Sequence, residues 1–326
     1  MLPTGIDYLD KNFRLPLFTI WSLSLERQLG QSWRVKAGYT GNKGTHLFYI
    51  FQRGARDVNA AIYIPGNSTV GNTQARRPNE DFSNIFAVES THNSNYHSLE
   101  LLAEKRFGYG LSLLTHYTWS KKLDDLGGLY AAGTNPFDRR FDYGLANEDV
   151  PHNFRFTNVW EVPKVGAKGF TAKILNGWMV NSIVTWQSGV PFSVLSGVDH
   201  SFSGVGRDRA DYVGGNATLD SGRPHGELIL QYFNTSVFTV NREGTFGNSG
   251  RNILRGPRYF NTDFSILKNT SISDGKSVQF RAEFFNAFNN VNFGLPNSTL
   301  SSGSQFGRIT SAFDPRIVQF GLKFLF

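Results

Sequence analysis

Apolar and polar residues alternate along much of this chain, which is the pattern of β-strands that present two different faces. The stretch Trp33–Tyr39, W-R-V-K-A-G-Y, carries aliphatic or aromatic side chains at every second position. The stretch Ser277–Phe284, S-V-Q-F-R-A-E-F, alternates in the same way, and helical periodicity is limited to one turn near Ala172–Leu175. The alternation predicts nine strands, at residues 17–29, 33–50, 95–107, 111–121, 151–163, 177–193, 258–269, 276–288 and 315–326.

The connections between these strands alternate between short and long. The short connections are 30–32, 108–110, 164–176 and 270–275, and the long ones are 51–94, 122–150, 194–257 and 289–314. Several predicted strands also exceed the roughly 5–6 residues usual in soluble domains and match the roughly 9–11 needed to cross a bilayer. Short periplasmic turns and long extracellular loops are typical of outer-membrane barrels. We therefore predict an all-β fold, a partial antiparallel transmembrane β-barrel of about nine long strands. A hairpin around Leu228–Val240 is an alternative that would break this alternation.

Charged residues fall on only one face of the best-patterned strands. An Arg or Lys that faces lipid at the bilayer midplane costs about 2–4 kcal/mol, so we assign the apolar face to lipid and the polar face to the lumen. The predicted lumen-facing polar residues are Arg34, Lys36, Arg155, Glu161, Asp263, Arg281 and Glu283. Taken one at a time, each of these residues is better explained as part of a solvated polar wall than as a contact for a solute.

All 6 tryptophans lie in predicted strands, on the face that we assign to lipid. They are Trp21, Trp33, Trp119, Trp160, Trp178 and Trp186, of which the last lies nearer the middle of its predicted strand. An indole combines an apolar body with one N–H donor, which suits the boundary between membrane and water. The pattern predicts an aromatic girdle, and the alternative is a set of core tryptophans in a soluble sandwich.

Composition narrows the class of protein further. Charged residues make up 18% of the chain, below the roughly 25% of average globular proteins, while aromatic residues make up 14% and there are 34 glycines. The net charge of +7 comes from scattered basic residues rather than from runs, so nucleic-acid binding is not indicated. The chain contains 0 cysteines, which excludes disulfides and a cysteine nucleophile.

The sequence contains no pattern that indicates a catalytic or metal-binding site. The chain lacks the G-x-S-x-G, H-E-x-x-H and G-x-x-x-x-G-K-[ST] motifs. His92 and His97 are better explained as solvated histidines than as metal ligands, and Asp208 with Asp211 lacks the spacing of a calcium loop. We predict no enzymatic activity, no metal and no cofactor.

Arginines in the long loops suggest one binding hypothesis. Arg53, Arg56, Arg76 and Arg77 could hold lipid phosphates or an anionic solute through bidentate guanidinium contacts. Scattered solvated charge is the plainer interpretation of the same residues.

Three stretches carry a resemblance to a known family. They are F-D-R-R-F-D-Y-G-L-A-N-E-D-V-P-H-N-F-R-F at Phe137–Phe156, T-F-G-N-S-G-R-N-I-L-R-G-P-R-Y-F-N-T-D-F-S-I-L-K-N at Thr245–Asn269, and F-R-A-E-F-F-N-A-F-N-N-V-N-F at Phe280–Phe293. With the terminal Phe326, they resemble the C-terminal barrel of Oar-like TonB-dependent outer-membrane receptors. The resemblance covers most of the chain from about Leu17.

The resemblance implies a location in the outer membrane of a Gram-negative-type bacterium and contact with its lipid. It also implies a barrel of roughly 22 strands, with a plug and a regulatory-like domain before it. On this expectation, residues 1–326 are the C-terminal part of the barrel, and the TonB complex is reached only through the absent N-terminal region. The complete receptor would take up or export an unknown solute. A soluble all-β carbohydrate-binding module and a structural or adhesive outer-membrane barrel are the alternatives.

The chain ends on a strand pattern, I-V-Q-F-G-L-K-F-L-F from Ile317 to Phe326. Its alternate apolar residues are Val318, Phe320, Leu322, Phe324 and Phe326. Unpaired backbone groups in hydrocarbon cost several kcal/mol each, so this strand is expected to pair with another strand of the barrel. A terminal strand of this kind resembles the signal that BamA-type insertion machinery reads.

Overall fold

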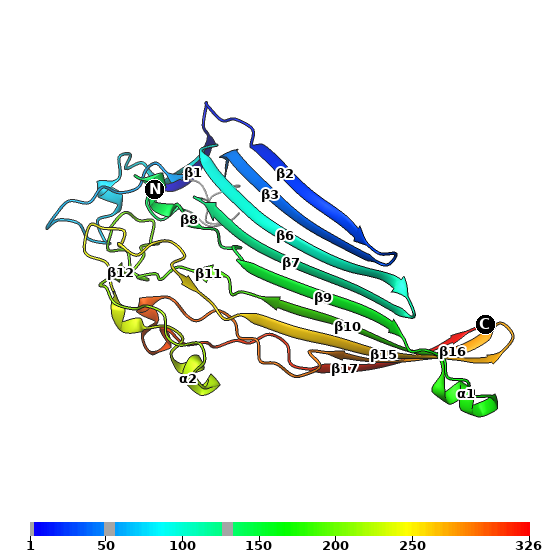
Figure 1. Cartoon of the computed structure of the whole chain (residues 1–326). Coiled ribbons are helices and arrows are strands. Elements are labelled where there is room, and N and C mark those ends of the chain that lie inside the picture. Colours follow the sequence, from blue (N-terminus) through cyan, green and yellow to red (C-terminus); the bar gives the residue numbers. More distant parts are fainter. Residues whose placement is uncertain (1–2, 49–55, 126–132) are drawn as a thin grey trace.

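The computed structural model describes residues 3–48, 56–125 and 133–326, and one antiparallel sheet of 10 strands dominates it (Figure 1). Nine long strands lie side by side in chain order, and the short β8 (Gly144–Leu145) pairs with the end of β7. The long strands are β2 (Leu17–Leu29), β3 (Trp33–Leu47), β6 (His92–Gly108), β7 (Leu111–Asp124), β9 (His152–Glu161), β10 (Trp178–Gln187), β15 (Tyr259–Ser273), β16 (Lys276–Phe285) and β17 (Ile317–Leu325). Every predicted strand therefore corresponds to one strand of the sheet.

Several strand boundaries differ from the prediction by a few residues, and the largest difference is at the end of β10. The predicted strand 177–193 ends at Gln187, and a separate β11 (Pro191–Phe192) follows it. Gly189 packs against the backbone of Gly256, far along the chain, so closely that a Cβ atom would overlap it, and Pro191 cannot donate to a ladder. The predicted strand 33–50 ends at Leu47, and its residues 49–50 lie outside the described residues.

The pairing register places the alternate residues of neighbouring strands on shared faces. One row of directly paired residues runs across seven strands, through Leu25, Ala37, Leu101, Tyr117, Phe154, Trp186 and Phe260. A row on the opposite face runs through Arg34, Glu104, Leu114, Thr157, Ile183 and Asp263. We call these the apolar face and the polar face of the sheet. They are continuous because the registers preserve the period-2 alternation, apart from shifts near strand ends at Gly44/Leu47, Lys105/Gly108 and Ser271/Ser273.

Short and long connections lie at opposite ends of the sheet, as predicted. The turn end carries 30–32, 109–110, 162–177 and 274–275, and the loop end carries 48–91, 125–151, 188–258 and 286–316. Tyr109 and Gly110 both have positive φ angles, 53° and 79°, which is the geometry of a two-residue type I′ hairpin turn. The turn of helix expected near Ala172–Leu175 is α1 (Gly169–Leu175), at the turn end.

The long connections form a layer of their own, which we call the loop layer. Besides β8 and β11, its elements are β1 (Thr4–Leu9), β4 (Arg56–Asp57), η1 (Gln74–Arg76), β5 (Phe82–Val88), η2 (Arg139–Asp142), β12 (Asp211–Tyr212), α2 (His225–Leu230), η3 (Thr235–Val237), β13 (Phe238–Thr239), β14 (Leu254–Arg255) and η4 (Leu300–Gln305). The region 228–240 contains α2, η3 and β13 rather than a hairpin. Over the described residues, no helix is long and apolar enough to cross a membrane.

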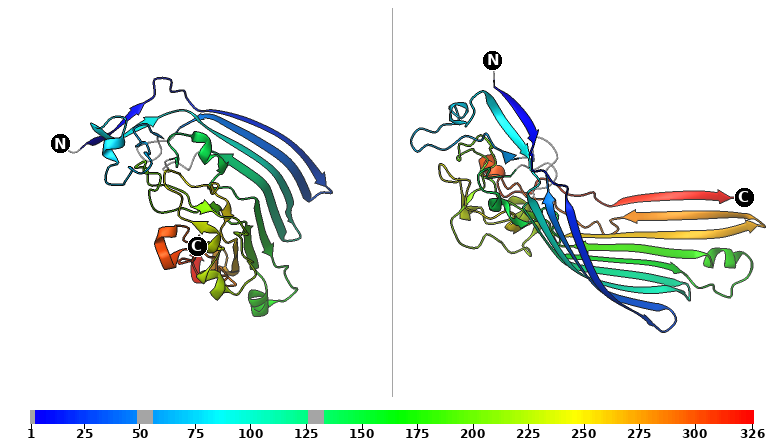
Figure 2. Two further views of the ribbon diagram at one scale, coloured as in Figure 1. Left: turned by 90° about the vertical axis from the view of Figure 1, so that its left-hand side faces the viewer. Right: turned by 90° about the horizontal axis from the view of Figure 1, so that it is seen from above.

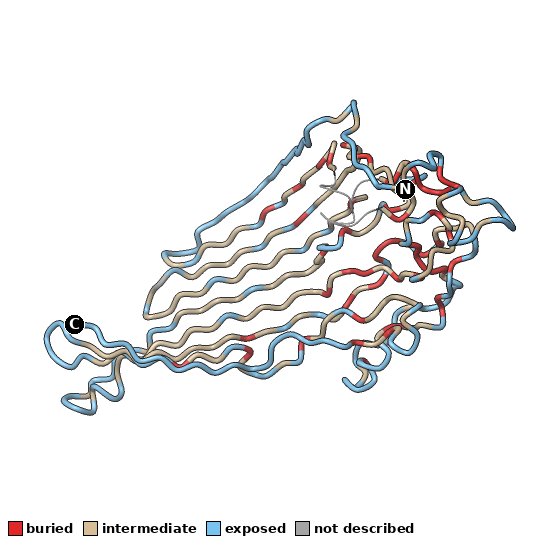
Figure 3. The backbone as a smooth tube through the Cα atoms, turned by 180° about the vertical axis from the view of Figure 1, so that it is seen from behind, coloured by how far each residue is buried: buried red, intermediate tan, exposed pale blue. Residues whose placement is uncertain are grey.

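The buried apolar core lies in the loop layer and not between faces of the sheet. The clustered core side chains are Phe192, Val194, Ala210, Phe233, Val237, Phe238 and Leu254. Figure 3 shows the buried segments gathered at the loop end, while the strands are mostly intermediate or exposed. This distribution is expected when an apolar sheet face contacts lipid, because only the water-exposed loops must bury apolar side chains within the protein.

The sheet is curved and open, with β2 and β17 at its edges (Figure 2). Both edge strands run from the loop end to the turn end, because an antiparallel path of nine strands begins and ends in the same direction. Direct pairing of β2 with β17 would therefore be parallel and would break the antiparallel pattern.

Candidate functional site

Two of the three motif stretches face each other in the loop layer. The guanidinium of Arg251 lies between the end of β7 and η2. Its Nη1 donates to Asp124 Oδ1 at 2.6 Å and to the backbone oxygens of Asp124 and Asp142 at 2.9 and 3.0 Å. Asn252 Nδ2 donates to Leu145 O at 2.7 Å and to Asn147 Oδ1 at 2.8 Å. Residues 251–252 thereby hold the connection 125–151 against the connection 188–258.

Two further arginines bind aspartates of the same connection. Arg209 Nη1 donates to Asp142 Oδ1 at 3.0 Å, and its guanidinium lies 3.9 Å from the centre of the Phe141 ring. Burial lowers the pKa of Arg209, and the charge of Asp142 offsets part of that effect. Arg255 forms a short ion pair with Asp149, whose side chain is 1% exposed. We call the pairs Arg251–Asp124, Arg209–Asp142 and Arg255–Asp149 the loop lock.

The loop arginines expected to bind anions have other partners in the structure. Arg76 donates to Asn72 Oδ1, Ile62 O, Thr69 O and Phe202 O at 2.7 to 3.1 Å, and its burial lowers its pKa. Arg77 is buried against Asp57 at 3.1 Å. Arg56 pairs with Glu89, and Arg53 lies outside the described residues. The hypothesis is therefore wrong for Arg76 and Arg77, whose guanidinium groups hold loop segments together.

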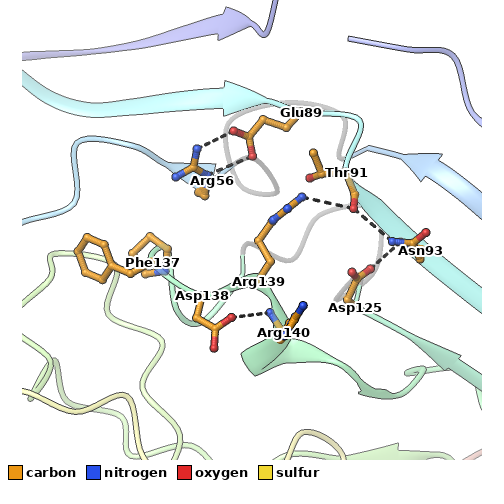
Figure 4. Close-up of a pocket in the computed structure, with 10 residues that line it drawn as sticks. Arg56, Glu89, Thr91, Asn93, Asp125, Phe137, Asp138, Arg139 and Arg140 are labelled. Carbon is orange, nitrogen blue, oxygen red and sulfur yellow. Dashed lines mark hydrogen bonds and ion pairs between the residues drawn. The ribbon is translucent and has the colours of Figure 1, made fainter. Parts of the chain in front are cut away.

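A cavity of about 570 Å³ opens beside the loop lock, at the loop end (Figure 4). Its lining residues are Arg56, Glu89, Thr91, Asn93, Asp125, Pro136, Phe137, Asp138, Arg139 and Arg140. We call it the loop-end pocket. It is built from β4, the chain around the start of β6, the residue after β7, and η2. Chain segments from two different connections, 48–91 and 125–151, therefore meet in one pocket beside the start of β6.

The acidic residues of the pocket are already bonded within the protein. Glu89 accepts two hydrogen bonds from Arg56, at 2.6 and 3.1 Å. Asp138 caps η2 by accepting from the Arg140 N–H at 2.9 Å. Asp125 accepts from the Asn93 N–H at 2.7 Å and lies 3.4 Å from His92. Burial by itself would raise the pKa of Asp125, but the hydrogen bonds from His92 and Asn93 outweigh it and the pKa is lowered.

Two arginines of the pocket retain donors for an external group. Arg139 and Arg140 are exposed on η2, and among the described residues neither forms an ion pair. Arg139 Nη1 makes one long contact, 3.5 Å to Thr91 O. Phe137 beside them is 59% exposed. The arrangement offers two forked cationic donors and an aromatic surface, which suits a ligand with an anionic group and an apolar or ring portion.

The six predicted girdle tryptophans lie on the apolar face in two rows. Trp33, Trp160 and Trp178 are at the turn end, and Trp21, Trp119 and Trp186 are at the loop end. Trp186 follows Trp178 by eight residues in β10. Trp21 is eight residues before Leu29, which pairs with Trp33. Trp119 is eight residues after Leu111, which pairs with Trp160. At about 3.3 Å per residue the rows are about 26 Å apart along the strands, or about 20 Å of depth at a tilt of about 40°. Trp186 is next to the last residue of β10, not near a strand middle.

The seven predicted lumen residues share the polar face but form separate groups. Arg34 bonds Glu104 at 2.6 Å and Glu26 at 3.5 Å, and Arg281 lies 3.6 Å from Glu283. Asp263 accepts from Asn261 Nδ2 and the Asn286 N–H at 2.8 and 2.9 Å. Lys36, Arg155 and Glu161 take no part in these groups, so the structure assembles a polar wall rather than one site.

Four of the five residues of the predicted insertion signal lie in β17, and the fifth comes directly after it. Val318, Phe320, Leu322 and Phe324 pair with Phe284, Ala282, Phe280 and Val278 on the apolar face, and Phe280 stacks on Phe320 with ring centres 6.2 Å apart. Phe326 follows the strand and is fully exposed.

The residues weighed as metal ligands do not meet. His92 faces Asp125, whereas His97 Nδ1 is bonded to Tyr39 Oη at 2.8 Å. Asp208 accepts from the Ser201 N–H and from Asn241, and burial raises its pKa. Within the described part of the chain, no group of three His, Cys, Asp or Glu residues is arranged for a metal ion.

Sequence reasoning missed the loop-end pocket and the loop lock. The signal was present, because η2 and Arg251 to Arg255 lie inside two of the three motif stretches. The alternation could not identify their roles, since ion pairs between distant loops have no period.

The chain has relatives in sequence and in structure. A family model described as an outer membrane beta barrel domain matches residues 1–319. The outer membrane transporter YddB from Escherichia coli has a TM-score of 0.54 and 8% identity, over 100% of this chain and 35% of that chain. The FrpB iron transporter from Neisseria meningitidis has a TM-score of 0.49 and 11% identity, over 98% of this chain and 32% of that chain. The chain thus spans about a third of the length of these transporters. A search of curated proteins gave no match.

Proposed function

Because this chain belongs to the outer membrane beta barrel domain family and so resides in the outer membrane, we propose that it forms part of the wall and the outer loops of a solute transporter. The observation that carries this proposal is the loop-end pocket, which opens at the end where the polar face meets the loop layer. A solute entering from outside would meet this pocket first. The polar face would then line its path.

The solute binds through Arg139, Arg140 and Phe137. The two guanidinium groups hold a carboxylate or another oxyanion of the solute, and the phenyl ring contacts its apolar or ring portion. Asp142, the last residue of η2, is fixed by Arg209, so the arginines are positioned before the solute arrives. Pre-organisation of this kind lowers the entropy lost on binding.

The complete barrel contains more strands than the described sheet. Open edges in hydrocarbon leave backbone groups without partners, so further strands cover β2 and β17. The number of additional strands is odd. The first and the last of them must each run antiparallel to the edge strand that they pair with, and both edge strands run in the same direction. This agrees with residues 1–326 being a C-terminal barrel portion that follows a plug, as the resemblance to Oar-like TonB-dependent receptors implies. Coupling to the TonB complex then runs through that N-terminal region.

Insertion of the barrel uses β17. Its apolar residues Val318, Phe320, Leu322, Phe324 and the terminal Phe326 are read by a BamA-type machine before the edge is covered. The proposed roles of the chain are binding, passage and membrane insertion, with no covalent chemistry.

Deletion and complementation of the gene in its native host test the transport proposal. The medium is analysed by mass spectrometry for compounds whose depletion or release requires the gene, with and without a protonophore. We expect at least one oxyanion-bearing compound that requires both the gene and the proton gradient. A gene-dependent compound that is insensitive to the protonophore would overturn TonB coupling. Unchanged media despite normal amounts of the barrel would favour a structural or adhesive role.

A further inference from the structure

The apolar face carries basic side chains at both of its ends and no acidic ones in the described parts of the nine long strands. The register places Lys43, His97, Lys121 and His152 on this face at the loop end, and Arg27, Lys105, Lys268 and Lys276 at the turn end. The acidic residues of these strands, such as Glu104 and Asp263, lie on the polar face. The charged side chains at the loop end and the turn end of this lipid-contacting face are therefore all basic.

Two of the turn-end residues, Lys105 and Lys268, are bonded within the protein. Lys105 Nζ donates to the backbone oxygens of Gly108 and Leu111 at 3.0 and 3.1 Å. Lys268 Nζ donates to Lys173 O at 2.6 Å and lies 5.3 Å from the centre of the Trp178 ring. These two ammonium groups are satisfied by carbonyls and an aromatic ring, so they require no external partner.

The loop-end lysines differ from them. Among the described residues, Lys43 Nζ and Lys121 Nζ have neither a hydrogen bond nor an ion pair. Lys121 pairs directly with His97 across β6 and β7, and Lys43 pairs with Asn95 across β3 and β6. Directly paired residues have Cβ atoms about 4.5–5.5 Å apart, and diagonal neighbours about 7–8 Å. Lys43, Asn95, His97 and Lys121 thus form one cluster, which we call the outer basic patch.

Aromatic rings hold the centre of the patch in place. The His97 ring stacks on Tyr39 and meets Trp21 edge-on, with ring centres 6.1 Å apart in both cases. Tyr39 Oη is bonded to His97 Nδ1 at 2.8 Å, which leaves Nε2 for another group. Trp21 lies in the same register row as His97 and Lys121. The patch is therefore at the depth of the loop-end tryptophan row, where lipid headgroups begin.

We propose that the outer basic patch binds the phosphate of an outer-leaflet lipid. Lys43 and Lys121 approach the phosphate from two sides, His97 and Asn95 supply donors between them, and Trp21 contacts the first part of the acyl region. This inference rests on the proposed function in one respect only, namely that the long loops lie on the outer side of the outer membrane. A phosphate fits because the patch has cationic donors, no acidic neighbour on its face among the described strand residues, and contact with lipid on that face.

Lipid titration of the purified protein tests this site. The protein is extracted in detergent, freed of lipid, and titrated with diphosphoryl lipid A, with binding followed by native mass spectrometry. Near a membrane surface each lysine contributes enough that the double variant K43Q/K121Q should bind about 30-fold more weakly, a change of about 2 kcal/mol. Lys36→Gln is the matched control, because it removes one lysine from the polar face of β3.

Three results would overturn the proposal: equal binding by K43Q/K121Q and the wild type, equal loss in K36Q, or equal binding of lipid A without phosphates. Heat-modifiable mobility establishes that each variant is folded. Because the readout contains no solute, loss of lipid binding with intact gene-dependent uptake would leave the transport proposal standing. Absence of such uptake would equally leave the lipid titration valid.

Discussion

Arg251 and Asp124 are 127 residues apart in the sequence, and Arg251 Nη1 lies 2.6 Å from Asp124 Oδ1, with side chains 6% and 8% exposed. This pair joins the end of β7 to the connection between β10 and β15. It is the central member of the loop lock, since Arg251 also bonds the backbone of Asp142 in η2. The outer loops are consequently one packed layer and not separate excursions from the sheet.

Replacement of Arg251 by methionine should loosen the loop layer without disrupting the strands. The change leaves the Asp124 carboxylate buried without its partner, which costs about 3–5 kcal/mol. Protease digestion and hydrogen exchange should show faster cleavage and exchange in 133–151 and 188–258 only. Lys122→Gln is the control, because the Lys122–Glu148 pair is exposed and worth about 0–1 kcal/mol. Unchanged protection in Arg251→Met would contradict the lock.

Replacement of Gly41 by alanine should displace Trp21 from its place in the loop-end row. A Cβ atom at Gly41 would overlap the Trp21 indole, and overpacking of this kind costs about 1–3 kcal/mol. The melting temperature of the barrel in detergent should fall, and Trp21→Ala in the same chain should restore part of it. Gly38→Ala serves as the control, since its Cβ would make an ordinary 3.6 Å contact with Ser24. Equal effects at Gly38 and Gly41 would argue against the indole contact.

The lowered pKa of Asp125 predicts a loss of stability in acid. The folded-state pKa is below the usual 3.8, so the folded protein binds fewer protons than the unfolded chain. The contribution of Asp125 to the free energy of unfolding is complete above about pH 3.8, the usual pKa, and disappears as the pH falls through the folded-state pKa. Guanidinium unfolding in detergent, followed across acid pH, should show a shallower dependence in Asp125→Asn. An identical pH slope in the variant would contradict the assignment.

The double variant R139A/R140A should weaken binding of the transported solute. Hydrogen bonds to charged groups contribute about 1.5–3 kcal/mol each, so affinity should fall at least about tenfold. The measurement is uptake or binding of the compound identified by the gene-deletion experiment. Arg242→Ala is the control, because the Arg242 side chain is 83% exposed and lies outside the pocket lining. If R242A weakened binding as much, general surface charge rather than the pocket would be responsible.

Replacement of Phe326 by aspartate should impair insertion and leave the stability of assembled barrels unchanged. Phe326 is fully exposed beyond the end of β17, so its side chain contributes little packing in the described structure. The fraction of heat-modifiable barrel in the outer membrane should fall, whereas Phe326→Tyr should assemble normally. Phe313→Asp changes another exposed phenylalanine, in a connection at the loop end, and should have no such effect. Normal assembly of Phe326→Asp would remove this role.

The strands and their faces could be predicted from the sequence, because both depend on local alternation. The pattern W-R-V-K-A-G-Y places Arg34 and Lys36 opposite Trp33 and Val35 in any strand, whatever its neighbours. The end of β10 was misplaced because apolar residues continue past Gln187 to Phe192. What ends the strand is the contact of Gly189 with Gly256, which lies at the far end of the same long connection.

The sequence by itself thus determined the all-β class, the long strands, the two faces and the opposite positions of turns and loops. The tertiary structure alone decided which partners the loop arginines have, where the buried core lies, and that Arg139, Arg140 and Phe137 share a pocket. The physical reason is the range of the interactions. Alternation follows from the pleat of a single strand, whereas a pair such as Arg251–Asp124 depends on the register of several strands and the folding of two long loops.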